Sequence, residues 1–87
     1  MFIVGRPLSI DVPDHAIERA EQRVGLSERQ VLAYWETVAE SWQDRLANIR
    51  VGNTDRLIDG GAVWVVKRHS EYGIRVMTVI SDGRRGK

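Results

Sequence analysis

The stretch RLIDGGAVWVVKRHSEYGIRVMTVIS, residues 56–81, decides the fold class because its composition and turn signals are those of successive strands. It contains three runs rich in β-branched and aromatic residues, which favour strands. The runs are residues 56–58, 62–70 and 74–81. Between them, DGG (59–61) and EYG (71–73) are short turn-forming groups, and glycine tolerates the positive φ of a tight turn. The stretch therefore predicts an antiparallel meander of three strands within residues 51–81.

A first helix is predicted over residues 13–24, where apolar residues recur with a period of about 3.6. Pro13 suits the first turn of a helix, because its missing N–H would have no partner there, and Asp14 complements the positive end of the helix dipole. Gly25 readily adopts the left-handed conformation that ends many helices. We therefore expect this helix to end at Val24.

A second helix is predicted from residue 28 to residue 50 without a break. Ser27 and Gln30 have the spacing of a capping box, in which each side chain satisfies a main-chain N–H at the helix start. Eight apolar residues then share an arc of roughly 120°. They are Val31, Leu32, Trp35, Val38, Ala39, Trp42, Leu46 and Ile49. Because Trp35 and Trp42 belong to this arc, we expect both indole rings to lie in the hydrophobic core.

Residues 1–12 are expected to form an extended lead-in or an edge strand, because Pro7 lacks the N–H that a central strand needs. Residues 82–87 have no apolar side chain and are expected to be a mobile basic tail. The expected fold is one α+β domain over residues 1–87, in which a helix hairpin (13–50) packs on an antiparallel sheet of three to four strands. The other face of the sheet would be open for binding.

The composition restricts the compartment and the kind of partner. The 87 residues include no cysteine, and the opening MFIVG is too short for a membrane-spanning segment, so we expect a cytoplasmic protein with no membrane partner. The net charge is only +1, but Lys67 to Lys87 holds six basic residues against two acidic ones. A basic C-terminal third favours a phosphate-bearing partner, and an ordinary solvated face of charges is the alternative explanation.

No pattern in the chain predicts a cofactor. The two histidines, His15 and His69, lie on different predicted elements without the HExxH spacing, so we expect no metal ion. DGG lies between two strands, whereas nucleotide-binding glycine loops join a strand to a helix. The chain also lacks a serine-nucleophile signature.

A metal-free set of polar residues remains as the candidate site. His15, Arg19 and Arg23 are spaced four apart, so they form a row along one side of the first helix at the border of its apolar face. Such a row is either a site or a rim of ordinary charges. Arg68, with Lys67 as a rival, lies late in the middle predicted strand.

Thr78 interrupts the apolar run of the last predicted strand, so its hydroxyl needs a hydrogen-bond partner or a solvated face. A three-residue loop at 71–73 would place Thr78 on the face of Arg68. A four-residue loop would place it with Lys67 and His69 instead. The sequence leaves both registers open.

The order of these motifs resembles a known fold family. HxxxRxxxR on a first helix, GLSERQV opening a second, a DGG hairpin, then VWVVKR and a closing IRVMTVIS are similar to the small toxin-type domains of the barnase, colicin and RelE ribonuclease fold, closest to the compact colicin-D-like group. The resemblance covers about residues 13–81. In that group the site residues are a helix histidine and arginines, a strand arginine or lysine, and a strand serine or threonine. The matching residues are His15, Arg19, Arg23, Arg68 and Thr78.

The resemblance implies a metal-independent endoribonuclease of toxin type, in which a ribose 2′-OH attacks the adjacent phosphorus. His15 would transfer protons, because imidazole changes its charge near neutral pH. Guanidinium groups would hold the scissile phosphate, and Thr78 would orient one of them. The implied partners are RNA and an antitoxin.

The alternative is a non-enzymatic accessory module of phage or plasmid type, which keeps a toxin-like fold and binds a host protein or nucleic acid. The low net charge favours this interpretation. A homodimer is a further alternative, in which part of the tryptophan-bearing second helix would be covered by a second copy.

Overall fold

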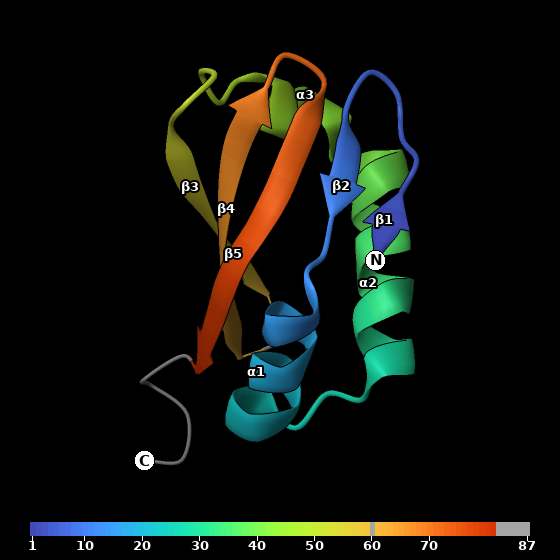
Figure 1. Cartoon of the computed structure of the whole chain (residues 1–87), viewed down its shortest axis with the longest axis vertical. Coiled ribbons are helices and arrows are strands. Elements are labelled where there is room, and N and C mark those ends of the chain that lie inside the picture. The colour runs from blue at the N-terminus through green and yellow to red at the C-terminus, as the bar shows by residue number, and fades with distance from the viewer. Residues whose placement is uncertain (60, 82–87) are drawn as a thin grey trace.

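The protein is described by a computed structural model over residues 1–59 and 61–81, and within these ranges it has five strands and three helices (Figure 1). The elements are β1 (Phe2–Ile3), β2 (Ser9–Asp11), α1 (Asp14–Val24), α2 (Glu28–Ser41), α3 (Gln43–Ala47), β3 (Thr54–Asp59), β4 (Ala62–Ser70) and β5 (Gly73–Ser81). The α+β class is confirmed. The predicted basic tail, residues 82–87, and the middle glycine of DGG, Gly60, lie outside the described residues.

The strands form one sheet in the order β1-β2-β5-β4-β3. The predicted meander is confirmed, because β3 pairs with β4 and β4 with β5, both antiparallel. The prediction of a wholly antiparallel sheet of three to four strands is wrong, since β2 pairs parallel to β5 and the sheet has five strands.

The prediction of an extended lead-in or an edge strand over residues 1–12 agrees with β1, which lies at one edge of the sheet, but not with β2. β2 is flanked on both sides, by β1 and β5. Pro7 lies two residues before the first residue of β2, so its missing N–H removes no bond from the ladder. The peptide bond before Pro7 is cis, and the chain reverses there between β1 and β2.

α1 agrees with its sequence signals. Pro13 precedes the first residue of the helix, and its carbonyl accepts hydrogen bonds from the N–H groups of Ala16 and Ile17. Gly25 follows the last residue with φ 70°, in the left-handed conformation, and its N–H donates to Glu21. The predicted bounds of 13–24 are therefore confirmed to within one residue.

The predicted continuous helix over 28–50 is wrong. The capping box of Ser27 and Gln30 is present, but α2 ends at Ser41, and α3 begins after Trp42, which has φ −114° and ψ 19°. In a continuous helix the main-chain N–H of Gln43 would donate to the carbonyl of Ala39. Here the Gln43 side chain donates to that carbonyl instead, through Nε2 at 2.8 Å.

Gln43 also joins the helical layer to the start of β2. Its Oε1 accepts from the N–H of Leu8, and its Nε2 donates to the carbonyl of Leu8, both at 2.9 Å. Gly5 packs so closely against this contact that a Cβ on it would lie 2.5 Å from the Leu8 oxygen and 2.6 Å from Gln43 Nε2. This long-range contact explains the helix break at Trp42, where the sequence has no glycine or proline to predict one.

The core lies between the helices and one face of the sheet. Trp35 of α2 is fully buried and meets Trp64 of β4 edge to face, with ring centroids 5.3 Å apart. Tyr34 stacks on Trp64 at 5.5 Å. The predicted burial of Trp35 is confirmed, whereas Trp42 is only partly buried against the core. None of the helices in the described ranges combines the length and apolar character needed to cross a membrane.

Candidate functional site

The basic row of α1 lies against the open edge of β5. β2 pairs only with Gly73–Arg75, so within the described chain the rest of β5 has no strand partner on that side. His15 Nε2 donates to the carbonyl of Met77 at 3.0 Å, and Arg23 Nη1 donates to the carbonyl of Val79 at 3.2 Å. His15 and Arg23 therefore bind carbonyl oxygens of β5 that would otherwise be free to pair with a further strand.

Arg19 occupies the middle of the row, one turn from His15 and one turn from Arg23. Its side chain is exposed, and its guanidinium has no hydrogen-bond partner among residues 1–59 and 61–81. Arg19 is therefore the one residue of the row whose side chain makes no hydrogen bond within the described chain.

Arg68 is bound to main-chain oxygens on the helix side of the sheet. Its Nη1 donates to the carbonyls of Ala47 and Ile49 at 3.0 and 2.8 Å, and its Nη2 donates to the carbonyl of Glu71 at 2.7 Å. Nε is buried without a partner in the described structure. The guanidinium joins the end of α3 to the β4–β5 turn, so its phosphate-binding capacity is largely occupied.

Thr78 lies on the opposite face of the sheet from Arg68. It pairs with Val65, and the register then shifts so that Val66 pairs with Val76, which leaves Met77 as the extra residue of a bulge. The β4–β5 loop contains only Glu71 and Tyr72, but the pairing of Thr78 is that of the predicted alternative in which it shares a face with Lys67.

The five predicted site residues therefore do not converge on one point. They divide between the β5 edge, the helix-side face and the outer face of the sheet. None of them lines the groove between β1 and α2, nor the smaller cavities beside α1, at residues 48–55 and between α2 and β4. The geometry for proton transfer at a held phosphate is not assembled by these contacts.

The sheet face turned away from the helices carries a different set of polar groups. Directly paired residues share a face, so the registers define cross-strand rows on this outer face. One row is Thr54, Lys67, Arg75, Asp11 and Phe2; the next is Arg56, Val65 and Thr78; the third is Ile58, Val63 and Ile80. No helix of the described residues covers these rows, because the buried core packs on the other face.

Arg56, Lys67 and Arg75 form what we call the basic triad of this outer face. Lys67 and Arg75 are directly opposite each other, and Arg56 is the diagonal neighbour of Lys67. Arg75 is also bound to Asp11, with Nε 3.1 Å from Oδ2. Arg56 and Arg75 were not singled out from the sequence, because only the strand register places them beside Lys67.

One perturbed ionisable group lies elsewhere, at a small cavity of about 170 Å³ between α2 and the β3–β4 end of the sheet. Burial raises the pKa of the Tyr34 phenol to about 12; the carboxylate of Asp59 adds to the rise and Arg45 opposes it. The Tyr34 hydroxyl is buried with no partner in the described structure. A phenol held this firmly is not suited to acid–base chemistry near neutral pH.

Comparisons with known proteins add no relative to this picture. No family model matches the chain, and searches of curated proteins and of solved structures give no significant match.

Proposed function

We propose that this protein is a non-enzymatic module that binds single-stranded RNA on the outer face of its sheet. The observation that carries the proposal is the pairing of Lys67 with Arg75, two like charges directly opposite each other on a face that no described helix covers. Like charges in this position destabilise a sheet. A phosphate between them would accept charge-assisted hydrogen bonds from Lys67 and from the guanidinium nitrogens of Arg75 other than Nε, which is bound to Asp11.

The rest of the outer face suits a single strand better than a duplex. The row of Ile58, Val63 and Ile80 offers aliphatic surface to bases whose faces are accessible, as they are in single strands. Thr78 lies in the same cross-strand row as Arg56, between this apolar row and the Lys67–Arg75 pair. A hydrogen bond from its hydroxyl to a ribose 2′-OH would distinguish RNA from DNA.

RNA cleavage, which the toxin-type resemblance implies, is a separate prediction. His15 Nε2, Arg23 Nη1 and both Nη atoms of Arg68 hold main-chain oxygens, so cleavage through these atoms would require the contacts to break when RNA binds. Binding without cleavage requires no such rearrangement. For this reason we favour the non-enzymatic function.

Fluorescence anisotropy with a labelled RNA of about twelve nucleotides tests binding, read between about 50 and 200 mM salt. The Lys67→Ala/Arg75→Gln variant should weaken binding at least about tenfold and reduce the salt slope by about 0.7 for each charge removed. The matched control, Arg29→Ala/Arg50→Ala, removes two exposed charges from outside the outer face and should bind like the unmodified protein.

Three outcomes would overturn the proposal. They are no binding at low salt, equal weakening in the control, and equal affinity for the DNA of the same sequence with no loss in Thr78→Val. The same samples, run on a gel with chelator present, report cleavage. Cleavage that falls about 10²-fold or more in His15→Ala, with binding kept, would establish the ribonuclease instead.

A further inference from the structure

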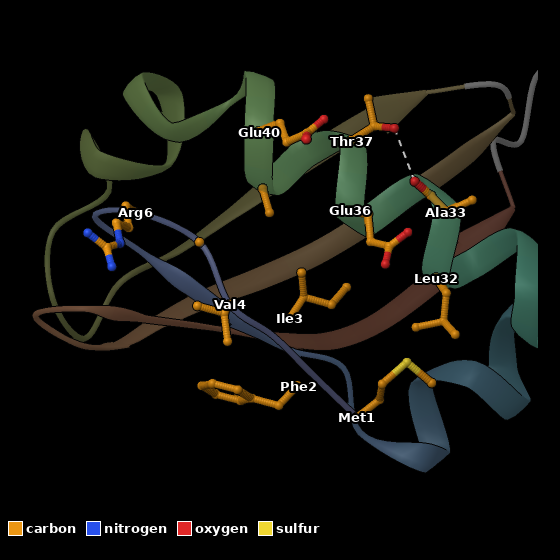
Figure 2. A pocket seen from close by; sticks show the side chains of 12 residues that line it. Met1, Phe2, Ile3, Val4, Arg6, Leu32, Ala33, Glu36, Thr37 and Glu40 are labelled. Carbon is orange, nitrogen blue, oxygen red and sulfur yellow. Dashed lines mark hydrogen bonds between the residues drawn. The ribbon is translucent and has the colours of Figure 1, made fainter.

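A groove of about 1290 Å³ lies between β1 and α2, on the side of the sheet where β1 forms the edge (Figure 2). One side is formed by Met1–Arg6 and the other by residues 32–40 of α2. Figure 1 shows that α2 runs alongside β1 at the edge of the sheet. The groove therefore combines a helix surface with the exposed edge of a strand.

The edge of β1 has main-chain groups available for another strand. Met1 and Val12 exchange two hydrogen bonds, from the Met1 amino group to the Val12 carbonyl at 2.9 Å and from the Val12 N–H to the Met1 carbonyl at 2.7 Å. In an antiparallel pair the next residue then directs its N–H and C=O away from the partner. The N–H and C=O of Phe2 therefore point to the open edge, since β1 is an edge strand of the described sheet.

The side chains around the groove are apolar along β1, with the basic Arg6 where the chain leaves that strand, and partly acidic on the helix. Phe2 and Val4 are 63% and 76% exposed, which is unusual for such large apolar side chains in adjacent positions of one face. On the other side, Figure 2 shows Glu36 across the groove from Ile3. Glu36 and Glu40, one helical turn apart, form no ion pair with any residue in the described ranges.

We propose that this groove binds an extended peptide segment of a partner protein, which adds to β1 as a sixth strand and carries basic residues at alternate positions. The spacing supports such a partner. Glu36 and Glu40 are separated by about 6 Å along α2, four residues at 1.5 Å each. Alternate residues of a strand are separated by about 6.6 Å and point to the same face. Two basic side chains at alternate positions would therefore each meet one carboxylate.

The intervening residues of the peptide would point to the other face, where Phe2 and Val4 are exposed. Apolar residues at those positions would cover both side chains, as cross-strand neighbours do within a sheet. Main-chain hydrogen bonds to Phe2 would supply affinity, and the carboxylates would supply the choice of sequence, which is the usual division in strand addition. This site adjoins the outer face, because Phe2 lies in the same cross-strand row as Lys67 and Arg75. Glu36 and Glu40 belong to no row of that face, so exchanging them tests this proposal alone.

The test uses the labelled peptide Ac-TVKVKVT-NH2 with the full chain, read by anisotropy and by amide chemical shifts. We expect binding that weakens at least about tenfold in Glu36→Gln/Glu40→Gln, the scale of losing charge-assisted hydrogen bonds. Glu18→Gln/Glu21→Gln, which removes two exposed carboxylates from α1, is the matched control and should bind normally. Amide shifts should be confined to residues 1–6 and 32–40.

Two control peptides separate strand addition from simple charge attraction. Ac-TVEVEVT-NH2 reverses the charges and should not bind, and Ac-TVKPKVT-NH2 keeps both lysines but loses a main-chain donor and should bind at least about tenfold more weakly. Equal binding of either control peptide, equal weakening in Glu18→Gln/Glu21→Gln, or shifts elsewhere would overturn the proposal. So would sedimentation showing that a second copy of the chain already covers β1, or RNA binding that is lost in Glu36→Gln/Glu40→Gln.

Discussion

His15 Nε2 lies 3.0 Å from the carbonyl oxygen of Met77, which is 62 residues further along the chain. Together with the contact of Arg23 to Val79, this hydrogen bond shows that the basic row of α1 covers the part of the β5 edge that β2 leaves unpaired. An unpaired strand edge is a site of unwanted pairing between chains. Side-chain donors on a covering helix are a compact way of blocking it.

His15→Ala and Arg23→Ala should each lower the free energy of unfolding by about 0.5–1.5 kcal/mol, the net value of one hydrogen bond. Urea denaturation measures the loss, and amide exchange should become faster along β5 in both variants. Arg19→Ala, from the middle of the same row, should change stability by less than about 0.5 kcal/mol. A loss in Arg19→Ala as large as in the other two would contradict edge closure as the cause, because alanine has the highest helix propensity and does not itself weaken the helix.

Arg68→Ala should be among the most destabilising exchanges of a charged residue, at about 2–4 kcal/mol. It removes three hydrogen bonds, to the carbonyls of Ala47, Ile49 and Glu71, of which the bond to Ile49 is partly buried. Arg68→Lys should recover only part of this loss, because an ammonium cannot reproduce the planar fork that reaches both sides. Thermal denaturation checks both variants. Full stability in Arg68→Lys would contradict the geometric explanation.

Gln43→Ala should cost about 2–3 kcal/mol, because both main-chain groups of Leu8 lose their partner. Gln43→Glu should not restore stability, since a carboxylate accepts from the Leu8 N–H but cannot donate to its carbonyl. Gln22→Ala on the exposed side of α1 is the control. A circular dichroism spectrum with more helix in Gln43→Ala would further support the assignment of the break at Trp42 to this side chain.

Tyr34 should make stability fall as the pH rises from about 10 to about 12. The native chain holds the phenol proton with a pKa of about 12, against 10.0 for an ordinary tyrosine, so in this window the unfolded chain binds fewer protons and gains relative stability. Denaturation at several alkaline pH values measures the slope. Tyr34→Phe should remove this contribution at no cost near pH 7, because the buried hydroxyl has no partner to lose. An unchanged alkaline slope in Tyr34→Phe would assign the effect to another group.

The parts of the fold that depend on local signals are predictable from the sequence. The capping box of Ser27 and Gln30, the end of α1 at Gly25, and the three strands of the meander each depend on residues within a few positions of one another. The break at Trp42 and the parallel pairing of β2 depend instead on contacts with distant segments, Gln43 with Leu8 and β2 with β5. Helix periodicity cannot report such contacts.

The candidate site is less predictable than the fold for a related reason. The helix spacing correctly places His15, Arg19 and Arg23 in a row, but the partner of that row is a strand edge created by the tertiary structure. A bulge at Met77 determines the face of Thr78, and local composition does not specify where a strand gains one extra residue. The sequence therefore shows which side chains could act chemically, but not which groups lie next to them in the fold.

The parallel pairing of β2 with β5 also has a consequence for how the chain folds. Asp11 and Arg75 are 64 residues apart, so this contact must close a loop that is most of the chain, at a cost in chain entropy that no local turn reduces. On the ribosome, Leu8 and Ile10, both fully buried in the finished protein, stay without their neighbours until β5 has left the exit tunnel. During that interval the growing polypeptide exposes a hydrophobic segment, which chaperones and the strand edges of other nascent chains can bind.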